Sequence, residues 1–198
     1  MSSDGQDREA ERALDEVAAA VHSVSSEELD AIADELVAAR RIACYAGGRE
    51  GLVLRGLVMR LFHAGLDAHY AGEMTCPAVG PGDVVVLSCG PGRISTVEAL
   101  LGVALRDGAR VLYLTAQPGE PPADRADHVV PVRAQTMADD LPGNSAADPG
   151  ESASRAVLPM GSAYEIALFV LVDLITNRVR VRRSEPAEAM RARHTNLE

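Results

Sequence analysis

Lysine is absent from this chain of 198 residues, and all 19 basic side chains are arginine. The absence excludes enzymes whose chemistry needs a lysine amine, such as Schiff-base aldolases, pyridoxal-phosphate enzymes and Walker-A or kinase-type nucleotide sites. Arginine cannot replace lysine as a nucleophile because its guanidinium stays protonated. Genomic base composition would explain the absence without any selection for function, and the exclusion holds either way.

The chain also has few cysteines, no net positive charge and no long apolar run. The three cysteines, Cys44, Cys76 and Cys89, are too few and too widely spaced for a disulfide framework or a metal site. A net charge of −10 disfavours nucleic acid and anionic membranes as partners. No apolar run approaches the roughly 18 residues of a membrane-spanning helix, and no signal-peptide pattern opens the chain. We therefore expect a cytoplasmic globular protein without a cofactor.

Apolar residues recur at helical or strand spacing through most of the chain. One helix is expected within residues 1–24, and Ser25 with Glu28 forms the capping box of a second helix that ends near Arg40. Short apolar runs predict strands, and amphipathic stretches predict helices. The strands are expected at 41–45, 68–70, 83–88 and 110–115, and the helices at 51–63 and 94–106. This alternation predicts a doubly wound α/β domain with a parallel sheet over residues 25–198.

Two segments towards the C-terminus have unusual composition. Residues 135–155 are polar and acidic, which predicts a long irregular loop, either a solvated insertion or a lid. Residues 160–181 predict a long helix that is apolar around more of its circumference than one sheet face can cover. We expect this helix to form a subunit interface in a homo-oligomer. The last eight residues, RARHTNLE, predict a polar tail.

Two glycine-rich turns follow predicted strands, where a doubly wound sheet binds its ligand. The first is AGGREG at 46–51, and the second is CGPGRIST at 89–96. Each combines glycines with an arginine at the start of a helix, so both turns suit an anionic group. A dinucleotide-binding fingerprint with Glu73 as its ribose-binding acid is the alternative, but Ala46 stands where its first glycine belongs.

With these motifs, the sequence resembles the sugar isomerase (SIS) domain family, and within it the 6-phospho-3-hexuloisomerases, from residue 25 to residue 198. The matching segments are AGGREG, MRLFHAG, GEMTCP, GPGR, LPMGSAYE and RHTNLE. The resemblance implies a three-layer α/β/α sandwich with a five-stranded parallel sheet, a dimer or tetramer, and a sugar-like substrate. It also implies proton transfer through a cis-enediol, with Glu165 as the general base and His194 assisting from a neighbouring segment or subunit. Glu165 could otherwise be only a favourable acid in the first turn of its helix.

Both turns depart from the family pattern, which reads GxGRSG and SGSGxT. Glu50 replaces the serine of the first turn, and Pro91 and Ile94 replace a serine and the threonine of the second. Losing two or three charge-assisted hydrogen bonds, each worth about 1.5–3 kcal/mol, weakens phosphate binding. A carboxylate about 5 Å from a phosphate adds repulsion. If Glu50 instead points outward and caps its helix, the phosphate site is intact.

Three functions follow from this sequence. They are a divergent isomerase of a polyhydroxylated or α-hydroxycarbonyl compound, an ordinary 6-phospho-3-hexuloisomerase, and a catalytically silent module that binds a small ligand. Because pure binding needs neither a base nor a histidine, the presence of Glu165 and His194 favours an isomerase. The candidate substrate-binding residues are Gly48, Arg49, Glu50, Glu73, Thr75, Cys89, Gly90, Gly92, Arg93, Ser95 and Gly161. Cys89 is either a nucleophile with a lowered pKa or an inert small residue.

Overall fold

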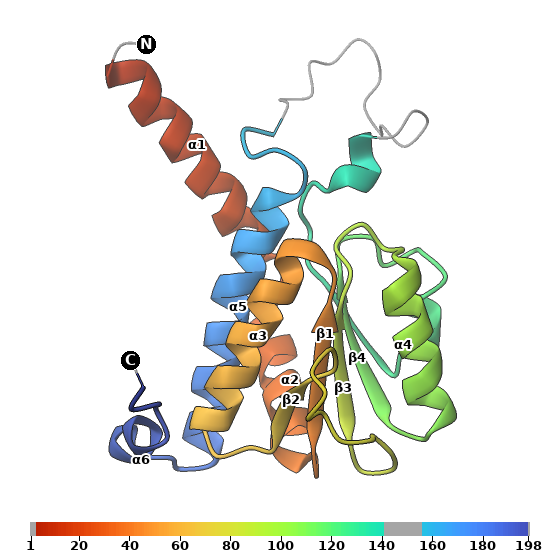
Figure 1. The fold of residues 1–198 in the computed structure, drawn as a ribbon. Helices are drawn as coiled ribbons and strands as arrows, with labels where there is room; N and C mark the ends of the chain where they lie inside the picture. The colour runs from red at the N-terminus through yellow and green to blue at the C-terminus, as the bar shows by residue number, and fades with distance from the viewer. Residues whose placement is uncertain (1–2, 141–155, 198) are drawn as a thin grey trace.

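The computed structural model describes residues 3–140 and 156–197 (Figure 1). The strands are β1 (Ile42–Ala46), β2 (Ala68–Tyr70), β3 (Val84–Ser88), β4 (Arg110–Thr115) and β5 (His128–Pro131). The helices are α1 (Ser3–His22), α2 (Ser26–Ala38), α3 (Gly48–His63), α4 (Ser95–Arg106), α5 (Ser162–Arg182) and α6 (Ala187–Ala192), with short 3₁₀ turns at Ala123–Arg125 and Met137–Asp140. None of the helices in these ranges is long and apolar enough to cross a membrane.

The five strands form one parallel sheet in the order β2-β1-β3-β4-β5. The central strand β3, with the sequence VVVLS, is buried at every position, as expected for a strand that helices cover on both faces. Ala46 of β1 pairs with Ser88 of β3, so the carboxyl ends of these two strands lie level with one another. The expected doubly wound α/β fold with a five-stranded parallel sheet is confirmed.

Helices α2, α3 and α5 cover one face of the sheet, and α4 covers the other (Figure 1). Alternate residues of β1 divide between these two layers. Cys44 belongs to the core beneath α3 and α5, whereas Ala43 belongs to the core beneath α4. Helix α1 packs along α5, with Val17 and Ala20 buried against Ala167. The α/β/α layering therefore leaves the carboxyl ends of the strands facing the loops that precede α3, α4 and α5.

A histidine ties the edge strand β5 to α2. The His128 ring has Nε2 2.5 Å from Glu28 Oε1 and Nδ1 3.0 Å from Glu35 Oε2. These two carboxyl groups raise the pKa of His128 above its ordinary value, with Glu35 contributing the larger effect. The protonated ring can donate to both groups at once, so its charge contributes to holding the edge of the sheet against α2.

The structure corrects several expectations about local structure. Strand β5 adds to the expected strands, because its four residues are bounded by proline and by loops and carry too short a pattern to detect. The segment before the C-terminus is not simply a polar tail: α6 precedes it, and Arg193 donates to the carbonyl of His63. The first part of the expected irregular loop forms a 3₁₀ turn at Met137–Asp140. The rest of that loop, 141–155, lies outside the described residues.

Candidate functional site

The two glycine turns meet above the level ends of β1 and β3 and enclose a pocket. Its volume is about 220 Å³. The walls come from both turns, from the 3₁₀ segment near residue 136 and from the start of α5. The lining residues are Gly47, Gly48, Arg49, Glu50, Gly90, Pro91, Ile94, Thr136, Met137, Met160, Gly161, Tyr164 and Glu165. The pocket therefore lies where ligands bind in doubly wound sheets.

Arg49 and Glu165 form an ion pair on one wall. Arg49 Nη1 lies 2.8 Å from Glu165 Oε2 and donates a hydrogen bond of 2.9 Å to Ser162 Oγ. Within the described residues no hydrogen-bond donor is aligned with Glu165 Oε2, although this atom is buried. Burial raises the pKa of Glu165, and the Arg49 charge opposes that rise. This carboxylate oxygen is thus a buried acceptor held beside a cation, and no hydrogen bond from the described part of the chain occupies it.

Glu50 points inward rather than out to solvent. Its Oε2 accepts a hydrogen bond of 2.5 Å from Ser88 Oγ, and its Oε1 accepts one of 3.0 Å from the Gly90 amide. Ser88 Oγ in turn lies 3.0 Å from the Tyr164 hydroxyl. Burial raises the pKa of Glu50 most strongly, and the bonds from Ser88 and Gly90 partly offset it. The outward, helix-capping orientation of Glu50 is therefore wrong.

A glycine is required at position 90 by this arrangement. A Cβ atom there would lie 2.9 Å from the Tyr164 ring and 3.0 Å from Glu50 Oε1. Only glycine lets the backbone of the second turn approach both groups closely enough for its amide to reach the carboxyl group. The second turn is thus packed directly against Glu50 and Tyr164.

The rest of the second turn offers few donors to an anion. Pro91 has no amide hydrogen, and the Ile94 side chain reaches towards the first turn, 3.6 Å from where a Cβ of Gly47 would stand. Arg93 turns away to form an ion pair of 3.2 Å with Glu98. An apolar side chain and an internal carboxyl group therefore occupy the space between the two turns.

Only some of the candidate residues meet in this pocket. Gly48, Arg49, Glu50, Gly90 and Gly161 line it together with Glu165. The other candidates lie outside the lining, and these are Glu73, Thr75, Cys89, Gly92, Arg93 and Ser95.

Two of the outlying candidates have clear alternative surroundings. Glu73 pairs with Arg55 at 3.1 Å and borders a second cavity of about 420 Å³, together with Cys76. Cys89 is fully buried in the core beneath α4, where burial raises its pKa to about 11. That environment disfavours the thiolate, which argues against Cys89 as a nucleophile.

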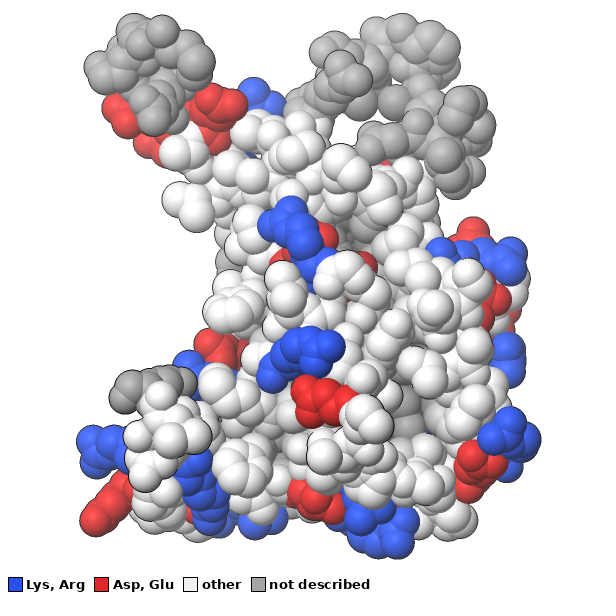
Figure 2. All heavy atoms as spheres, viewed as in Figure 1, with Lys and Arg blue, Asp and Glu red and all other residues white. Residues whose placement is uncertain are grey.

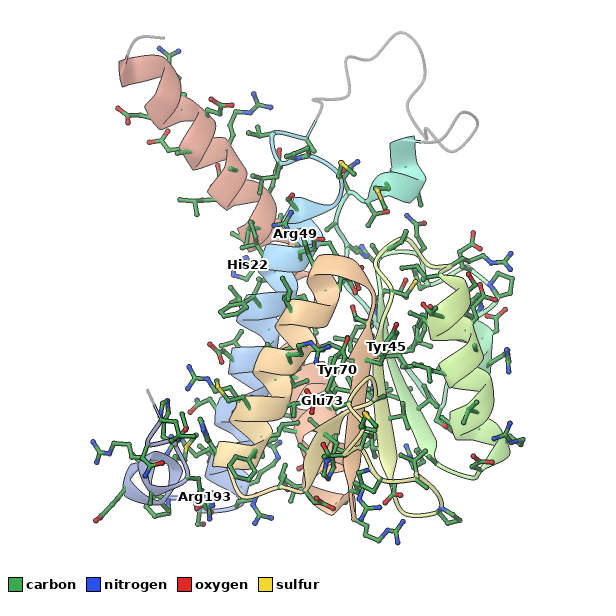
Figure 3. The ribbon with its side chains drawn as sticks, in the orientation of Figure 1. His22, Tyr45, Arg49, Tyr70, Glu73 and Arg193 are labelled. Carbon is green, nitrogen blue, oxygen red and sulfur yellow. The ribbon has the colours of Figure 1, made fainter. Side chains whose placement is uncertain are left out.

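His194 lies at the opposite end of α3 from the pocket. Its ring is 5.2 Å from that of His63, the last residue of α3, whereas Gly48 at the first residue of α3 lines the pocket. The helix separates these ends by about 22 Å. In Figure 3, Arg49 and Arg193, the neighbour of His194, lie towards opposite ends of α3. Within one protomer His194 cannot contact a ligand bound beside Glu165.

Sequence reasoning missed two polar members of the site, Ser88 and Tyr164. Ser88 is the last residue of β3, and the rule that ligands bind at the carboxyl ends of parallel strands could have identified it. Tyr164 precedes Glu165 in the GSAYE segment, but nothing in the sequence indicates that its hydroxyl points towards β3. No group of three or more potential metal ligands occurs in the described part of the chain.

Several solved structures share this fold. The chain matches a crystal structure of a hypothetical protein from Methanococcus jannaschii, for which a 3-hexulose-6-phosphate isomerase function was inferred. The TM-score is 0.77, with 23% identity over 93% of this chain and 98% of the other. It also matches the Vibrio vulnificus NanR protein complexed with ManNAc-6P, with a TM-score of 0.72, 20% identity and coverage of 96% and 67%. The fold is that of the SIS phosphosugar isomerases.

Curated relatives narrow the class to one family. A 3-hexulose-6-phosphate isomerase of Mycobacterium gastri is 35% identical over 184 residues, which cover 93% of this chain and 87% of the relative. An enzyme of the same name from Bacillus subtilis is 29% identical over 88% of this chain and 89% of the relative. No protein-family model matches the chain. The chain belongs to the 3-hexulose-6-phosphate isomerase family.

Proposed function

We propose that this protein is an isomerase that transfers a proton between adjacent carbons through a cis-enediol, on a substrate other than the family's phosphohexulose. The observation that carries the proposal is the pairing of a buried carboxylate oxygen without a hydrogen bond from the described residues, Glu165 Oε2, with Arg49 in a pocket whose anion-binding turn is already filled by Glu50. Membership of an isomerase family supports the reaction type.

Glu165 is the base of the proposed reaction. Its Oε2 removes a proton from the carbon next to the substrate carbonyl, and the raised pKa of Glu165 makes it a stronger base than an exposed glutamate. Arg49, 2.8 Å from the same oxygen, keeps the carboxylate ionised before the reaction and donates to the adjoining Ser162. The pocket thus holds the base, Glu165, next to Arg49, whose guanidinium is fixed in place by Ser162.

The substrate is proposed to lack a phosphate at the second turn. The Gly90 amide and the Ser88 hydroxyl donate to Glu50 instead of to a ligand, and Pro91 and Ile94 offer no donor in place of the family's serine and threonine. A phosphate there would have to displace Glu50 and leave its carboxyl group without those bonds. A polyhydroxylated or α-hydroxycarbonyl compound would instead donate its hydroxyls to Glu50.

An ordinary 6-phospho-3-hexuloisomerase is the second candidate. The 35% identity to the Mycobacterium gastri enzyme over 93% of the chain favours it. In that case Glu50 would have to rotate out of the second turn when the phosphate binds. The two candidates differ in one measurable property, the use of a phosphorylated substrate.

A second subunit is proposed to complete the site. Because His194 lies about 22 Å from the pocket of its own chain, it could assist only at the pocket of a partner. Large apolar side chains on the outer faces of α3 and α5 are exposed, and Figure 2 displays a mostly uncharged surface there. They are Leu52, Met59, Phe62, Ile166, Phe169, Val170, Leu174 and Val181. Burial of this surface in a homo-oligomer would remove it from water.

Hydrogen exchange at carbon tests the proposal. The protein is incubated in D₂O with fructose 6-phosphate, and separately with D-fructose or dihydroxyacetone, and NMR follows replacement of carbon-bound protons by deuterium. Enzymatic exchange on an unphosphorylated compound alone supports the altered substrate, whereas efficient exchange on fructose 6-phosphate supports the second candidate. Glu165→Gln should abolish exchange, and an unchanged rate would remove Glu165 from the mechanism.

A further inference from the structure

We propose that Glu50 is a second catalytic carboxyl group, which carries the hydroxyl proton between two adjacent substrate oxygens while Glu165 carries the carbon-bound proton. This inference rests on the proposed isomerase function and concerns the same pocket. It assigns a chemical role to the residue that departs from the GxGRSG pattern, in a position where the family pattern has a serine.

Geometry distinguishes the two carboxyl groups of the pocket. Glu165 has a cation, Arg49, 2.8 Å away, which favours the ionised form and suits a base. Glu50 is held by neutral donors, Ser88 Oγ and the Gly90 amide. A carboxyl group without a counter-cation in a buried site takes up a proton more readily than one beside a guanidinium, and this suits an acid.

The Glu165 carboxylate acts in the same direction as burial. The titratable side chains that interact electrostatically with Glu50 come from α5, from the turn after β3 and from β4, and they are Glu165, Tyr164, Cys89 and Tyr113; of these, Glu165 raises the pKa of Glu50, whereas raised pKa values keep the other three neutral. Arg49, the neighbour of Glu50 in the chain, is engaged with Glu165 and Ser162. Ionisation of Glu50 is thus opposed both by burial and by the nearby Glu165 carboxylate.

The arrangement of donors fixes the orientation of Glu50. Ser88 and Tyr164 are buried and form a chain of hydroxyls that ends at Glu50 Oε2. The Gly90 amide binds Oε1 from the other side. Both donors stabilise the carboxylate that remains after Glu50 has given up its proton. The group is therefore pre-oriented, and the carboxylate that it leaves behind is stabilised.

The proton transfers balance over one reaction. The acid form of Glu50 donates its proton to the carbonyl oxygen while the Glu165 carboxylate removes the proton of the adjacent carbon, and the electron pair of that C–H bond forms the C=C bond of the enediol. The Glu50 carboxylate then takes the proton of the neighbouring hydroxyl as the new C=O bond forms, and Glu165 returns its proton to the other carbon. Both carboxyl groups end in their starting states.

Glu50→Gln is the decisive variant because glutamine keeps the size and, at the position of Oε2, one oxygen acceptor within 2.5 Å of Ser88 Oγ and 3.2 Å of the Gly90 amide, but cannot exchange a proton. On whichever of fructose 6-phosphate, D-fructose or dihydroxyacetone the wild type isomerises, we expect kcat to fall about 10²–10³-fold with KM changed little. The alkaline limb of the kcat/KM profile should disappear, because it reports loss of the Glu50 proton. Ser88→Ala, which removes a donor to the carboxylate, should move that limb to higher pH. Asp67→Asn, directly before β2 at the amino ends of the strands and outside the pocket, is the carboxyl-to-amide control.

An infrared measurement tests Glu50 apart from turnover. The difference spectrum between wild type and Glu50→Gln should contain a neutral carboxyl band that persists at about pH 6, where an ordinary glutamate is ionised. Absence of that band, or a wild-type kcat and alkaline limb in Glu50→Gln, overturns the role of Glu50. If the band is present and no compound undergoes exchange, the isomerase function fails and the protonated state of Glu50 stands. If His194→Ala is inactive while Glu50→Gln is fully active, then His194 and not Glu50 is the acid that protonates the carbonyl oxygen.

Discussion

Replacing Glu50 by serine should restore phosphate binding to the second turn. The change returns the family's serine hydroxyl to the first turn and releases the two donors that Glu50 now engages, Ser88 Oγ at 2.5 Å and the Gly90 amide at 3.0 Å. Because Glu50 and Gly90 line a pocket of about 220 Å³, the space vacated by the carboxyl group is open to a ligand. Pro91 and Ile94 still offer no donor, so the recovery is partial.

The magnitude follows from the donors released. A hydrogen bond to a charged group contributes about 1.5–3 kcal/mol net of hydration. Two such bonds at the lower end of this range give about 3 kcal/mol, or roughly a 10²-fold decrease in Kd. Removal of the carboxyl group also removes any repulsion from its ionised form, which adds to the effect. We therefore expect fructose 6-phosphate to bind Glu50→Ser at least about 10²-fold more tightly than wild type.

Isothermal titration calorimetry with fructose 6-phosphate and with inorganic phosphate measures this change. Glu50→Gln separates occupation of the donors from ionisation of the carboxyl group, because an amide oxygen at the position of Oε2 still accepts from Ser88 Oγ and the Gly90 amide, whereas the amide cannot ionise. If occupation of the donors is decisive, Glu50→Gln should stay close to wild type. Equal tightening in both variants would attribute exclusion to charge alone, and an unchanged Kd in Glu50→Ser would refute the reasoning altogether.

Three further predictions concern stability and assembly. Gly51→Ala places a Cβ 2.6 Å from the Ala46 carbonyl oxygen, so urea denaturation should report a loss of about 1–3 kcal/mol, whereas Gly56→Ala, with open space around it, should not destabilise. The raised pKa of His128 stabilises the fold below the unfolded value near 6.5, and this contribution should fade as pH rises through the folded value. His128→Gln should show a flatter dependence of unfolding free energy above pH 6; an unaltered slope contradicts the assignment. Phe169→Asp, on the exposed face of α5, should reduce the oligomer mass measured by light scattering, and a monomeric wild type would contradict the interface.

The sequence predicts the regular part of the fold well because its signals are local. The β-branched run DVVVLS and the segment RVLYLT identify β3 and β4 to within a residue, and the apolar stretch after residue 160 identifies α5. The sequence does not predict β5 because four residues are too few to show the alternation of a strand. The position of β5 depends on its pairing with β4 and on the contact of His128 with α2.

The composition of the site is less accessible from the sequence than its position. The ends of β1 and β3 and the two glycine turns place the pocket correctly, because parallel strands bring their carboxyl ends to one edge. The direction of the Glu50 side chain depends on contacts between residues far apart in the chain. Ser88 donates to Glu50 from 38 residues away, and Ser88 in turn is hydrogen-bonded to Tyr164, which is 76 residues further along. The separation of His194 from the pocket likewise depends on how α6 packs against the end of α3. Neither relation has a local signature in the sequence.

The lack of lysine limits which groups can move protons in this pocket. Arg49 is the arginine that lines it, and a guanidinium keeps its proton at every working pH, so Arg49 can stabilise charge but cannot relay a proton. Tyr164 is fully buried with its pKa raised well above 10, which keeps its hydroxyl neutral. Among the described residues that line the pocket, proton exchange near neutral pH therefore falls to the two carboxyl groups, Glu50 and Glu165. A carbonyl reaction in this pocket that used neither of them would need a group from a second subunit, and the pH profiles of the two glutamine variants decide between these routes.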